Sequence, residues 1–289
     1  MLDVACHLNV VAPDASPAHL PEALAALAAV GYRRVVLPPL DAEATDAAFV
    51  RGAFESAGLS PITIAGVGPA TDVSSPDADE REAGAASLRR YVDFTVSLGG
   101  DQMNGTPYGL FGHPAGPTSR EAFERSAAEV GRVADYAHEQ GVMMTFEVLN
   151  RYETSLVNTA AQAMSYVEAS GSEHLRIHLD TFHMAVEEAD IAGAIIDAMP
   201  KLGFLELGQS GRGPLEHGAV PLAEVVERVH GAGYGGRWGV EAFSRSVLPP
   251  EVAQMLAIWR SPYEDGAALA ASAFHVIERA AGFPAADRG

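Results

Sequence analysis

Cysteine and lysine are almost absent from this chain of 289 residues. Cys6 is the sole cysteine, which excludes an internal disulfide and any zinc site built from several cysteines. This usage is compatible with a reducing cytoplasm, where we expect the protein to reside. Lys201 is the sole lysine and follows Pro200 at the expected end of a helix, so the sequence disfavours lysine Schiff-base chemistry.

An excess of positive charge is also absent. The chain carries 38 acidic and 19 basic residues, a net charge of −19, so nucleic acid and anionic membrane surfaces are not expected partners. The longest apolar runs, such as ALAALAAV at 23–30, are shorter than the ~20 residues of a membrane helix. The N-terminus lacks a basic start, so we expect neither a signal peptide nor a membrane span. The glycine-rich phosphate motifs of nucleotide-binding proteins are missing too.

Short apolar stretches alternate with helical patterns along the whole chain. Eight stretches are expected to form strands, beginning near residues 2, 32, 61, 101, 142, 175, 204 and 237. Helical spacing is clearest at 19–31, 119–141 and 221–233. Eight βα units in fewer than 300 residues predict a closed (β/α)₈ TIM barrel, with an open doubly wound sheet as the alternative.

Several local features refine this interpretation. Glycines are expected to end the helices that precede four strands, namely Gly31, Gly141, Gly203 and Gly233. The acidic segment 68–84 reads as a loop that leads into a helix at 82–98. Because no linker or abrupt charge shift divides the chain, we expect one domain over 1–289. The tail after Ala280 is expected to fray.

Four consecutive expected strands, the fifth to the eighth, each carry an acid near the C-terminal end. These acids are Glu147, Asp180, Glu206 and Glu241. In a closed barrel they would converge at the mouth, where the active sites of such barrels lie. Unpaired buried carboxylates are costly, so the cluster predicts a divalent cation, with Mn²⁺ or Mg²⁺ favoured by oxygen ligands. The alternative is that each acid only caps a helix or pairs with an arginine.

Two segments near these acids are rich in polar residues. Glu153 lies far enough beyond the fifth strand to reach over the mouth, and His183 begins the loop after the sixth. His183 could donate to a sugar oxygen or serve as an ordinary loop histidine. His178 shares strand parity with Asp180, so we expect it to be a buried hydrogen-bond partner. Arg212 could bind a substrate oxygen or balance negative charge.

With these residues in view, the sequence resembles the ketose 3-epimerases of the D-tagatose/D-psicose type, within the xylose isomerase-like barrels. The resemblance is carried by EVLNRYETSLVNTA, LDTFHMAVEE, a loop ending in Arg212, VEAF and IWR. The spacing of the four acids also follows that family's pattern.

The resemblance implies a homo-oligomeric, metal-dependent enzyme acting on a keto-sugar. It implies metal ligands at Glu147, Asp180, Glu206 and Glu241. It also implies that Glu147 and Glu241 are the acid/base pair, one removing the proton beside the ketone to give a cis-enediolate and the other returning it on the opposite face. Substrate would be held by Glu153, His183 and Arg212, with Phe243 in an apolar wall.

The chain departs from the family pattern at three places. Glu206 stands where the family has a histidine ligand, Gln209 replaces an acid, and the loop at 7–17 lacks the usual aromatic residues. The expected function is a metal-dependent isomerase or epimerase of an unphosphorylated keto-sugar or related polyol. One alternative is elimination, as in inosose dehydration or cleavage of an oxidised glycoside. The other is a non-catalytic barrel subunit whose metal site is degraded.

Overall fold

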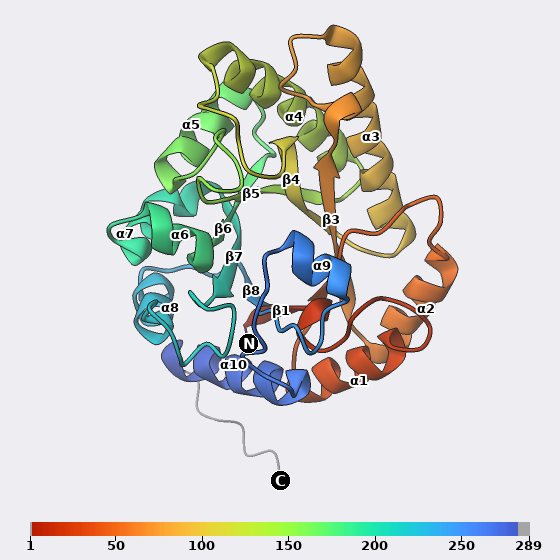
Figure 1. The fold of residues 1–289 in the computed structure, drawn as a ribbon, viewed down its shortest axis with the longest axis vertical. Helices are drawn as coiled ribbons and strands as arrows, with labels where there is room; N and C mark the ends of the chain where they lie inside the picture. The colour runs from red at the N-terminus through yellow and green to blue at the C-terminus, as the bar shows by residue number, and fades with distance from the viewer. Residues whose placement is uncertain (1, 283–289) are drawn as a thin grey trace.

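The computed structural model describes residues 2–282, whose eight parallel strands close into a barrel in chain order (Figure 1). The doubly wound alternative is therefore wrong, and the predicted (β/α)₈ barrel is confirmed. The strands are β1 (Asp3–His7), β2 (Arg34–Val36), β3 (Ser60–Val67), β4 (Gln102–Leu110), β5 (Met143–Val148), β6 (Arg176–Asp180), β7 (Leu202–Gly208) and β8 (Arg237–Glu241). Each begins within three residues of its predicted start.

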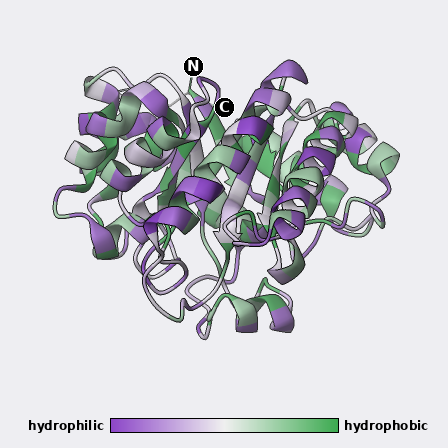
Figure 2. Cartoon of the chain, turned by 90° about the horizontal axis from the view of Figure 1, so that it is seen from above, coloured by the Kyte–Doolittle hydropathy of each residue, from purple (hydrophilic) through white to green (hydrophobic). Residues whose placement is uncertain are grey.

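Most of the helices surround the barrel and cover the outer faces of its strands, whereas the ninth lies in front of the barrel (Figure 1). They are α1 (Leu20–Val30), α2 (Ala47–Ala57), α3 (Ala78–Ser97), α4 (Arg120–Glu139), α5 (Ala160–Ser170), α6 (Thr181–Glu187), α7 (Ile191–Ala198), α8 (Leu222–Gly231), α9 (Pro250–Met255) and α10 (Gly266–Ala280). Three short 3₁₀ turns complete the described chain: η1 (Leu8–Val10), η2 (Pro69–Thr71) and η3 (Met199–Lys201). Hydrophilic and hydrophobic residues alternate along the outer helices, as amphipathic helices require (Figure 2).

Two local expectations needed correction. The α3 helix begins at Ala78, before the predicted residue 82, because the Asp77 side chain accepts a hydrogen bond from the backbone of Asp79 and caps the helix. Gly203 lies inside β7 rather than at a helix end, where a Cβ atom would lie 2.7 Å from the Cβ of Arg176. Gly31 does end α1, with a left-handed φ of 115°. α10 ends at Ala280, and the tail expected to fray lies mostly outside the described residues.

The barrel interior is divided along its axis. Its lower part holds an ion-pair cluster, in which Asp101 accepts hydrogen bonds from both Arg34 and Arg237. Above this cluster lies a small apolar layer made of Ala5, Val36, Ile62 and Phe204. The residues at the mouth are again polar. The base and the centre of the barrel therefore stabilise the fold, and the mouth is the expected place of an active site.

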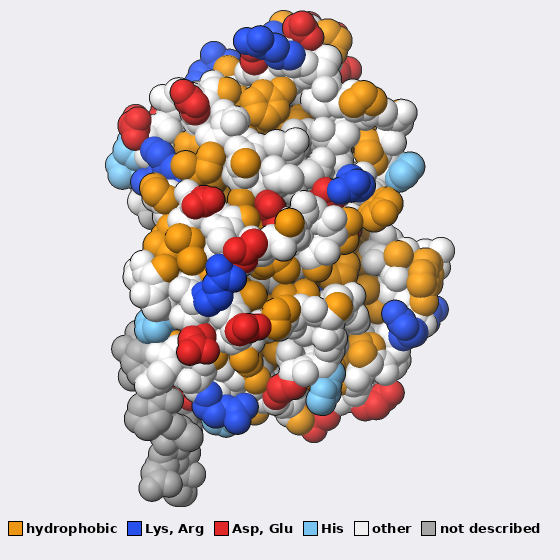
Figure 3. Space-filling view, turned by 90° about the vertical axis from the view of Figure 1, so that its left-hand side faces the viewer, with side chains coloured by type: hydrophobic (Ala, Val, Ile, Leu, Met, Phe, Trp, Pro, Cys, Tyr) orange, Lys and Arg blue, Asp and Glu red, His pale blue; other side chains and the backbone are white. Residues whose placement is uncertain are grey.

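Most of the apolar core lies between the strands and the helices. On the flank formed by α5 to α8, charged side chains of both signs are interspersed with apolar ones (Figure 3). Within residues 2–282, the helices are too short or too polar to cross a membrane.

Candidate active site at the barrel mouth

The four acids predicted from the sequence all lie at the C-terminal ends of their strands. Glu147 lies in β5, Asp180 ends β6, Glu206 lies in β7 and Glu241 ends β8. Asp180 and Glu206 are neighbours in the register of β6 and β7. Asp180 and Glu206 are completely buried, and Glu241 is 7% exposed. The mouth therefore holds several carboxylates that solvent reaches poorly.

Arg212 joins two of these acids. Its Nη1 atom lies 2.8 Å from Oδ2 of Asp180 and also pairs with Oε2 of Glu241. The guanidinium lies over the ring of Phe182, 3.7 Å from the ring centre. Arg212 has a φ of 53°, a left-handed conformation that is uncommon outside glycine, and its carbonyl accepts a hydrogen bond from the backbone of Phe243. The loop after β7 thus directs a buried positive charge onto Asp180 and Glu241.

Glu147 is contacted by the imidazole of His183, which lies in α6. The Nε2 atom of His183 lies 3.4 Å from Oε1 of Glu147 and 3.7 Å from Oδ2 of Asp180. Asn150 holds the other side of the imidazole, because its Nδ2 lies 2.8 Å from Nδ1 of His183 and donates to Glu153 at 3.0 Å. The loop after β5 therefore positions His183 and Glu153 together above Glu147.

Glu206 points into the barrel between two histidines. Its Oε1 atom lies 2.9 Å from Nε2 of His7, and its Oε2 atom lies 3.1 Å from Nε2 of His178. The other ring nitrogen of His7, Nδ1, lies 3.3 Å from Oε1 of Glu241. His7 comes from the end of β1, which pairs with β8 to close the barrel. An imidazole therefore stands between the carboxylates of β7 and β8.

Burial and neighbouring charges separate the pKa values of these acids. Burial raises the pKa of Glu241 to about 7, against the opposing effect of Arg212 and His7. Burial also acts to raise the pKa of Glu147, but His178 and His183 outweigh it and hold that pKa below its usual value. For His7, burial is outweighed by Glu206 and Glu241, which raise its pKa to about 9. Divergent pKa values in one site are typical of acid/base pairs.

The residues at the mouth are suited to holding a divalent ion. Three overlapping groups of acids and histidines bring one ligand atom from each member within 4.8 Å of one another. They are His7, Glu206 and Glu241; Glu147, Asp180 and His183; and Glu147, His178 and Glu206. Nε2 of His7 and both oxygens of Glu206 make ion-pair contacts but form no hydrogen bond. Carboxylates and imidazoles gathered in this way could hold a divalent ion.

A cavity of about 290 Å³ opens above these residues. Its lining includes Arg212, Phe243, Glu153, Phe182 and Trp259. Phe243 is buried, and its ring centre lies 5.4 Å from the guanidinium of Arg212. A cavity of this volume can hold a small polar molecule, which would contact charged and apolar groups at once.

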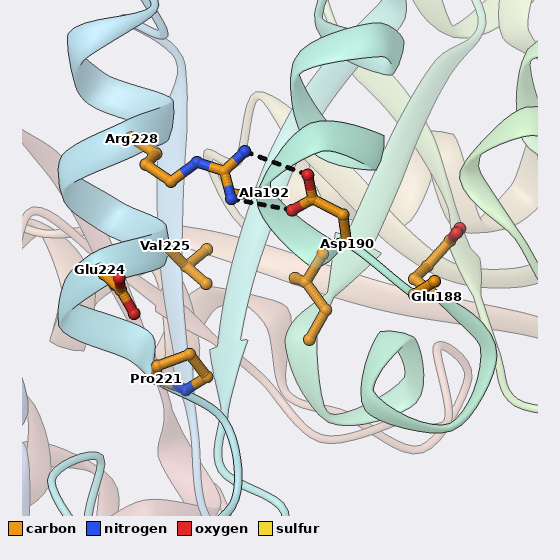
Figure 4. Close-up of a pocket in the computed structure, with 9 residues that line it drawn as sticks. Glu188, Asp190, Ala192, Pro221, Glu224, Val225 and Arg228 are labelled. Atoms are coloured by element: carbon orange, nitrogen blue, oxygen red, sulfur yellow. Dashed lines mark hydrogen bonds and ion pairs between the residues drawn. The ribbon is translucent and has the colours of Figure 1, made fainter.

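A groove of about 220 Å³ lies on the outer surface, between the start of α7 and α8 (Figure 4). It is a weaker candidate for a functional site than the barrel mouth. Its arginine, Arg228, donates to both carboxylate oxygens of Asp190. Asp190 also caps α7 by accepting from the backbone of Gly193. Because these charged groups already satisfy one another, the barrel mouth is the stronger candidate for chemistry.

The structure brings together every site residue predicted from the sequence, and it adds two that were missed. His7 and Asn150 were not singled out, although His7 ends a barrel strand as the four acids do. Gln209 faces away from the acids, and its amide donates to the carbonyls of Leu215 and Val220. The residue that replaces a family acid thus fixes the loop carrying Arg212.

Comparisons with known proteins agree with this geometry. The family model described as xylose isomerase-like TIM barrel matches residues 24–267. The chain is 37% identical to a ketose 3-epimerase of Arthrobacter globiformis over 243 residues, 84% of each chain. It is 32% identical to an L-ribulose 3-epimerase of Methylomonas sp. over 278 residues, 96% of this chain and 97% of the relative.

Solved structures give the same result. The crystal structure of a D-allulose 3-epimerase from Methylomonas sp. in complex with D-allulose superposes with a TM-score of 0.90, at 32% identity and covering 96% of each chain. The family match covers most of the sequence, the barrel is closed, and the acids lie where the strands end. This chain belongs to the xylose isomerase-like TIM barrel family.

Proposed function

We propose that this protein is a metal-dependent epimerase that inverts the carbon next to the ketone of a ketose. The observation that carries the proposal is the placement of Glu147 and Glu241 at the ends of β5 and β8, with β6 and β7 between them. Two carboxylates carried to one barrel mouth by different strands can serve opposite faces of a planar intermediate. Relatives named ketose, L-ribulose and D-psicose 3-epimerases support the same reaction class.

Glu147 and Glu241 would move the proton, one removing it and the other returning a proton to the opposite face. The hydroxyl of Tyr108 donates to the carbonyl of Glu147 at 2.8 Å, which fixes the end of β5. A divalent ion held by Glu147, Asp180 and Glu241 would polarise the ketone and stabilise the negative charge that develops on its oxygen. The sequence also predicted that Glu206 is a ligand, and this stays a prediction.

The remaining predicted residues would hold the sugar. His183 and Arg212 offer donors beside the acids, and Glu153 offers an acceptor above them. Phe243 gives the apolar wall against which the carbon chain of a ketose can pack. The cavity lining contains two basic residues, Arg212 and Arg260, and Arg212 is engaged by two carboxylates. We therefore favour an unphosphorylated substrate.

The test is exchange of the substrate proton with D₂O, followed by NMR over a panel of ketoses and inososes. Glu147→Gln and Glu241→Gln should each lower exchange by ~10²–10⁴-fold, because each keeps the shape of the side chain but removes its base. Glu124→Gln, an exposed residue of α4, is the matched control. Wild-type exchange in both variants would refute this acid/base assignment, and an unsaturated product would indicate elimination instead.

We also propose that the protein forms a homo-oligomer through the rim of the mouth. Among the described residues, six of the seven large exposed hydrophobic side chains follow or end β4, β5, β6 or β8 on this side: Leu110, Phe111, Tyr152, Val186, Met255 and Trp259. Such a concentration is typical of protein interfaces. Trp259→Glu should lower the mass measured by light scattering after size exclusion, whereas an unchanged mass would place the interface elsewhere. A cytoplasmic location stays a prediction.

A further inference from the structure

The hydroxyl of Thr181 continues the barrel sheet at a point that the backbone of β6 does not reach. The register of β6 with β7 ends at the pair Asp180 and Glu206, because the chain turns into α6 at Thr181. β7 runs on to Gly208, whose N–H donates to Oγ1 of Thr181 at 3.0 Å and whose carbonyl accepts from the same atom at 2.9 Å. A hydroxyl can donate and accept at once, so one buried side chain satisfies both polar groups of Gly208.

Gly208 in turn lies against the guanidinium of Arg212. A Cβ atom at Gly208 would lie 2.7 Å from Nη1 of Arg212 and 2.7 Å from Oδ1 of Asp180. Only three residues separate Gly208 from Arg212, and the backbone N–H of Arg212 donates to the carbonyl of Gln209 at 2.7 Å, which makes this loop a tight turn. A displacement of the Gly208 backbone would therefore move the guanidinium.

The other end of the Thr181 contact is the start of α6. The next two residues of that helix contact Arg212. The guanidinium lies 3.7 Å from the ring centre of Phe182, and its Nη2 atom lies 3.3 Å from Nε2 of His183. Asp180 caps the same helix, since its Oδ1 accepts from the backbone of Phe182 at 2.9 Å. Thr181 thus lies at the junction between the strand that leads to Arg212 and the helix that Arg212 contacts.

The backbone of Arg212 needs support from its surroundings. Its φ of 53° is left-handed, a conformation that a residue other than glycine keeps only where the surrounding structure holds it, and such residues cluster at ligand-binding and active sites. The carbonyl of Arg212 is held by the N–H of Phe243 at 2.8 Å. Earlier in the loop, Thr181 holds the chain at Gly208. The backbone that carries the guanidinium is therefore fixed at both places.

We propose that Thr181 is a positioning residue of this site, whose hydroxyl keeps the guanidinium of Arg212 in place beside α6. Thr181 acts through Gly208 and does not itself touch the substrate. The inference rests on the proposed function, in which Arg212 and His183 hold the sugar while two glutamates move the proton. It assigns a role to a residue outside the set predicted from the sequence. Loss of the hydroxyl should weaken the binding of the ketose more than it slows proton transfer.

The experiment is steady-state kinetics on the accepted ketose with Thr181→Val, which keeps the shape of the side chain but removes the hydroxyl. We expect KM to rise about 10–100-fold while kcat changes by less than about threefold, because contacts made equally in the ground state and the transition state act on KM. Thr181→Ser retains the hydroxyl and should restore KM to near the wild-type value. Thr95→Val is the matched control, since Thr95 is also completely buried near the end of α3, where its hydroxyl contacts Thr63 and the carbonyl of Tyr91.

The control separates positioning from stability. Thr95→Val should lower the melting temperature as Thr181→Val does, but its KM should equal that of the wild type. If Thr181→Val does not fold, Thr181→Ala takes its place, because its smaller side chain lets water reach the polar groups of Gly208, and the same rise in KM is expected. A wild-type KM in the folded Thr181 variant, or an equal rise in Thr95→Val, would overturn this proposal alone. A wild type that epimerises no ketose would overturn the proposed function, and this role with it.

Discussion

Gly239 of β8 leaves the space that the carboxylate of Glu206 occupies in β7. The two residues are partners in the register of β7 and β8, and a Cβ at Gly239 would lie 2.6 Å from Oε1 of Glu206. The same Cβ would lie 2.6 Å from the ring of Phe204, in the apolar layer below. The absence of a side chain at one position therefore sets both the height of the acid and the packing beneath it.

We accordingly expect Gly239→Ala to displace Glu206 or Phe204. Overpacking of a buried site costs about 1–3 kcal/mol, so the melting temperature should fall. Mn²⁺ affinity should fall as well, because Glu206 belongs to two of the three groups of possible ligands at the mouth. Calorimetric unfolding and a Mn²⁺ titration measure the two effects. Gly235→Ala is the control, since a Cβ there would meet nothing within 4 Å. Equal behaviour of the two variants would contradict this role for Gly239.

Asn150 should matter for turnover although it carries no charge. Its side chain contacts Nδ1 of His183 and donates to Glu153, so it holds the donor and the acceptor that we assign to substrate. Loss of such a supporting contact lowers activity by about 10–100-fold in comparable sites. Asn150→Ala should show this loss in kcat/KM with a smaller change in the melting temperature. Steady-state kinetics on the accepted ketose would test it, and an unchanged kcat/KM would show that His183 needs no such support.

Arg212 and a divalent ion should stabilise the same carboxylates. Without the guanidinium, Asp180 and Glu241 would be buried without their arginine partner, and breaking a buried pair costs about 3–5 kcal/mol. Arg212→Met should therefore lower the melting temperature strongly in the presence of a chelator. Mn²⁺ should recover more stability in this variant than in the wild type, because a ligand that binds only the native state stabilises it.

Arg120→Met is the matched control for this comparison, since Arg120 pairs with Glu124 on the exposed surface of α4. Surface pairs contribute about 0–1 kcal/mol, so its melting temperature should change little with or without the ion. If Mn²⁺ raised the melting temperature of Arg212→Met no more than that of the wild type, the two cations would not share these ligands.

The sequence predicted the barrel and most of its mouth because both depend on local patterns. Buried parallel strands are short apolar runs, and Glu147, Asp180, Glu206 and Glu241 stand out as acids at their ends. His7 was missed because its importance appears only when β1 pairs with β8 and brings the two ends of the chain together. Arg212 pairs with two acids from a backbone that has a left-handed φ of 53°. No pattern of residues in the sequence predicts this conformation.

The ion-pair cluster at the base of the barrel should govern part of the acid stability. Burial acts to raise the pKa of Asp101, but hydrogen bonds and charge from Arg34 and Arg237 outweigh it and hold the pKa below its usual value. A carboxylate with a lowered pKa in the folded state stabilises the protein above its unfolded pKa of about 3.9. That contribution is lost as the pH falls through the lower, folded pKa.

Asp101→Asn should therefore reduce the free energy of unfolding at pH 7, by about 1 kcal/mol because the carboxylate is partly exposed and screened. The difference from the wild type should shrink as the pH falls below about 4, since the wild type then loses the same interaction. Urea unfolding at a series of pH values measures this, with Asp197→Asn on the exposed face of α7 as the control. A difference that stays constant down to pH 2 would mean that Arg34 and Arg237 do not hold Asp101 ionised, and the base of the barrel would owe its stability to packing alone.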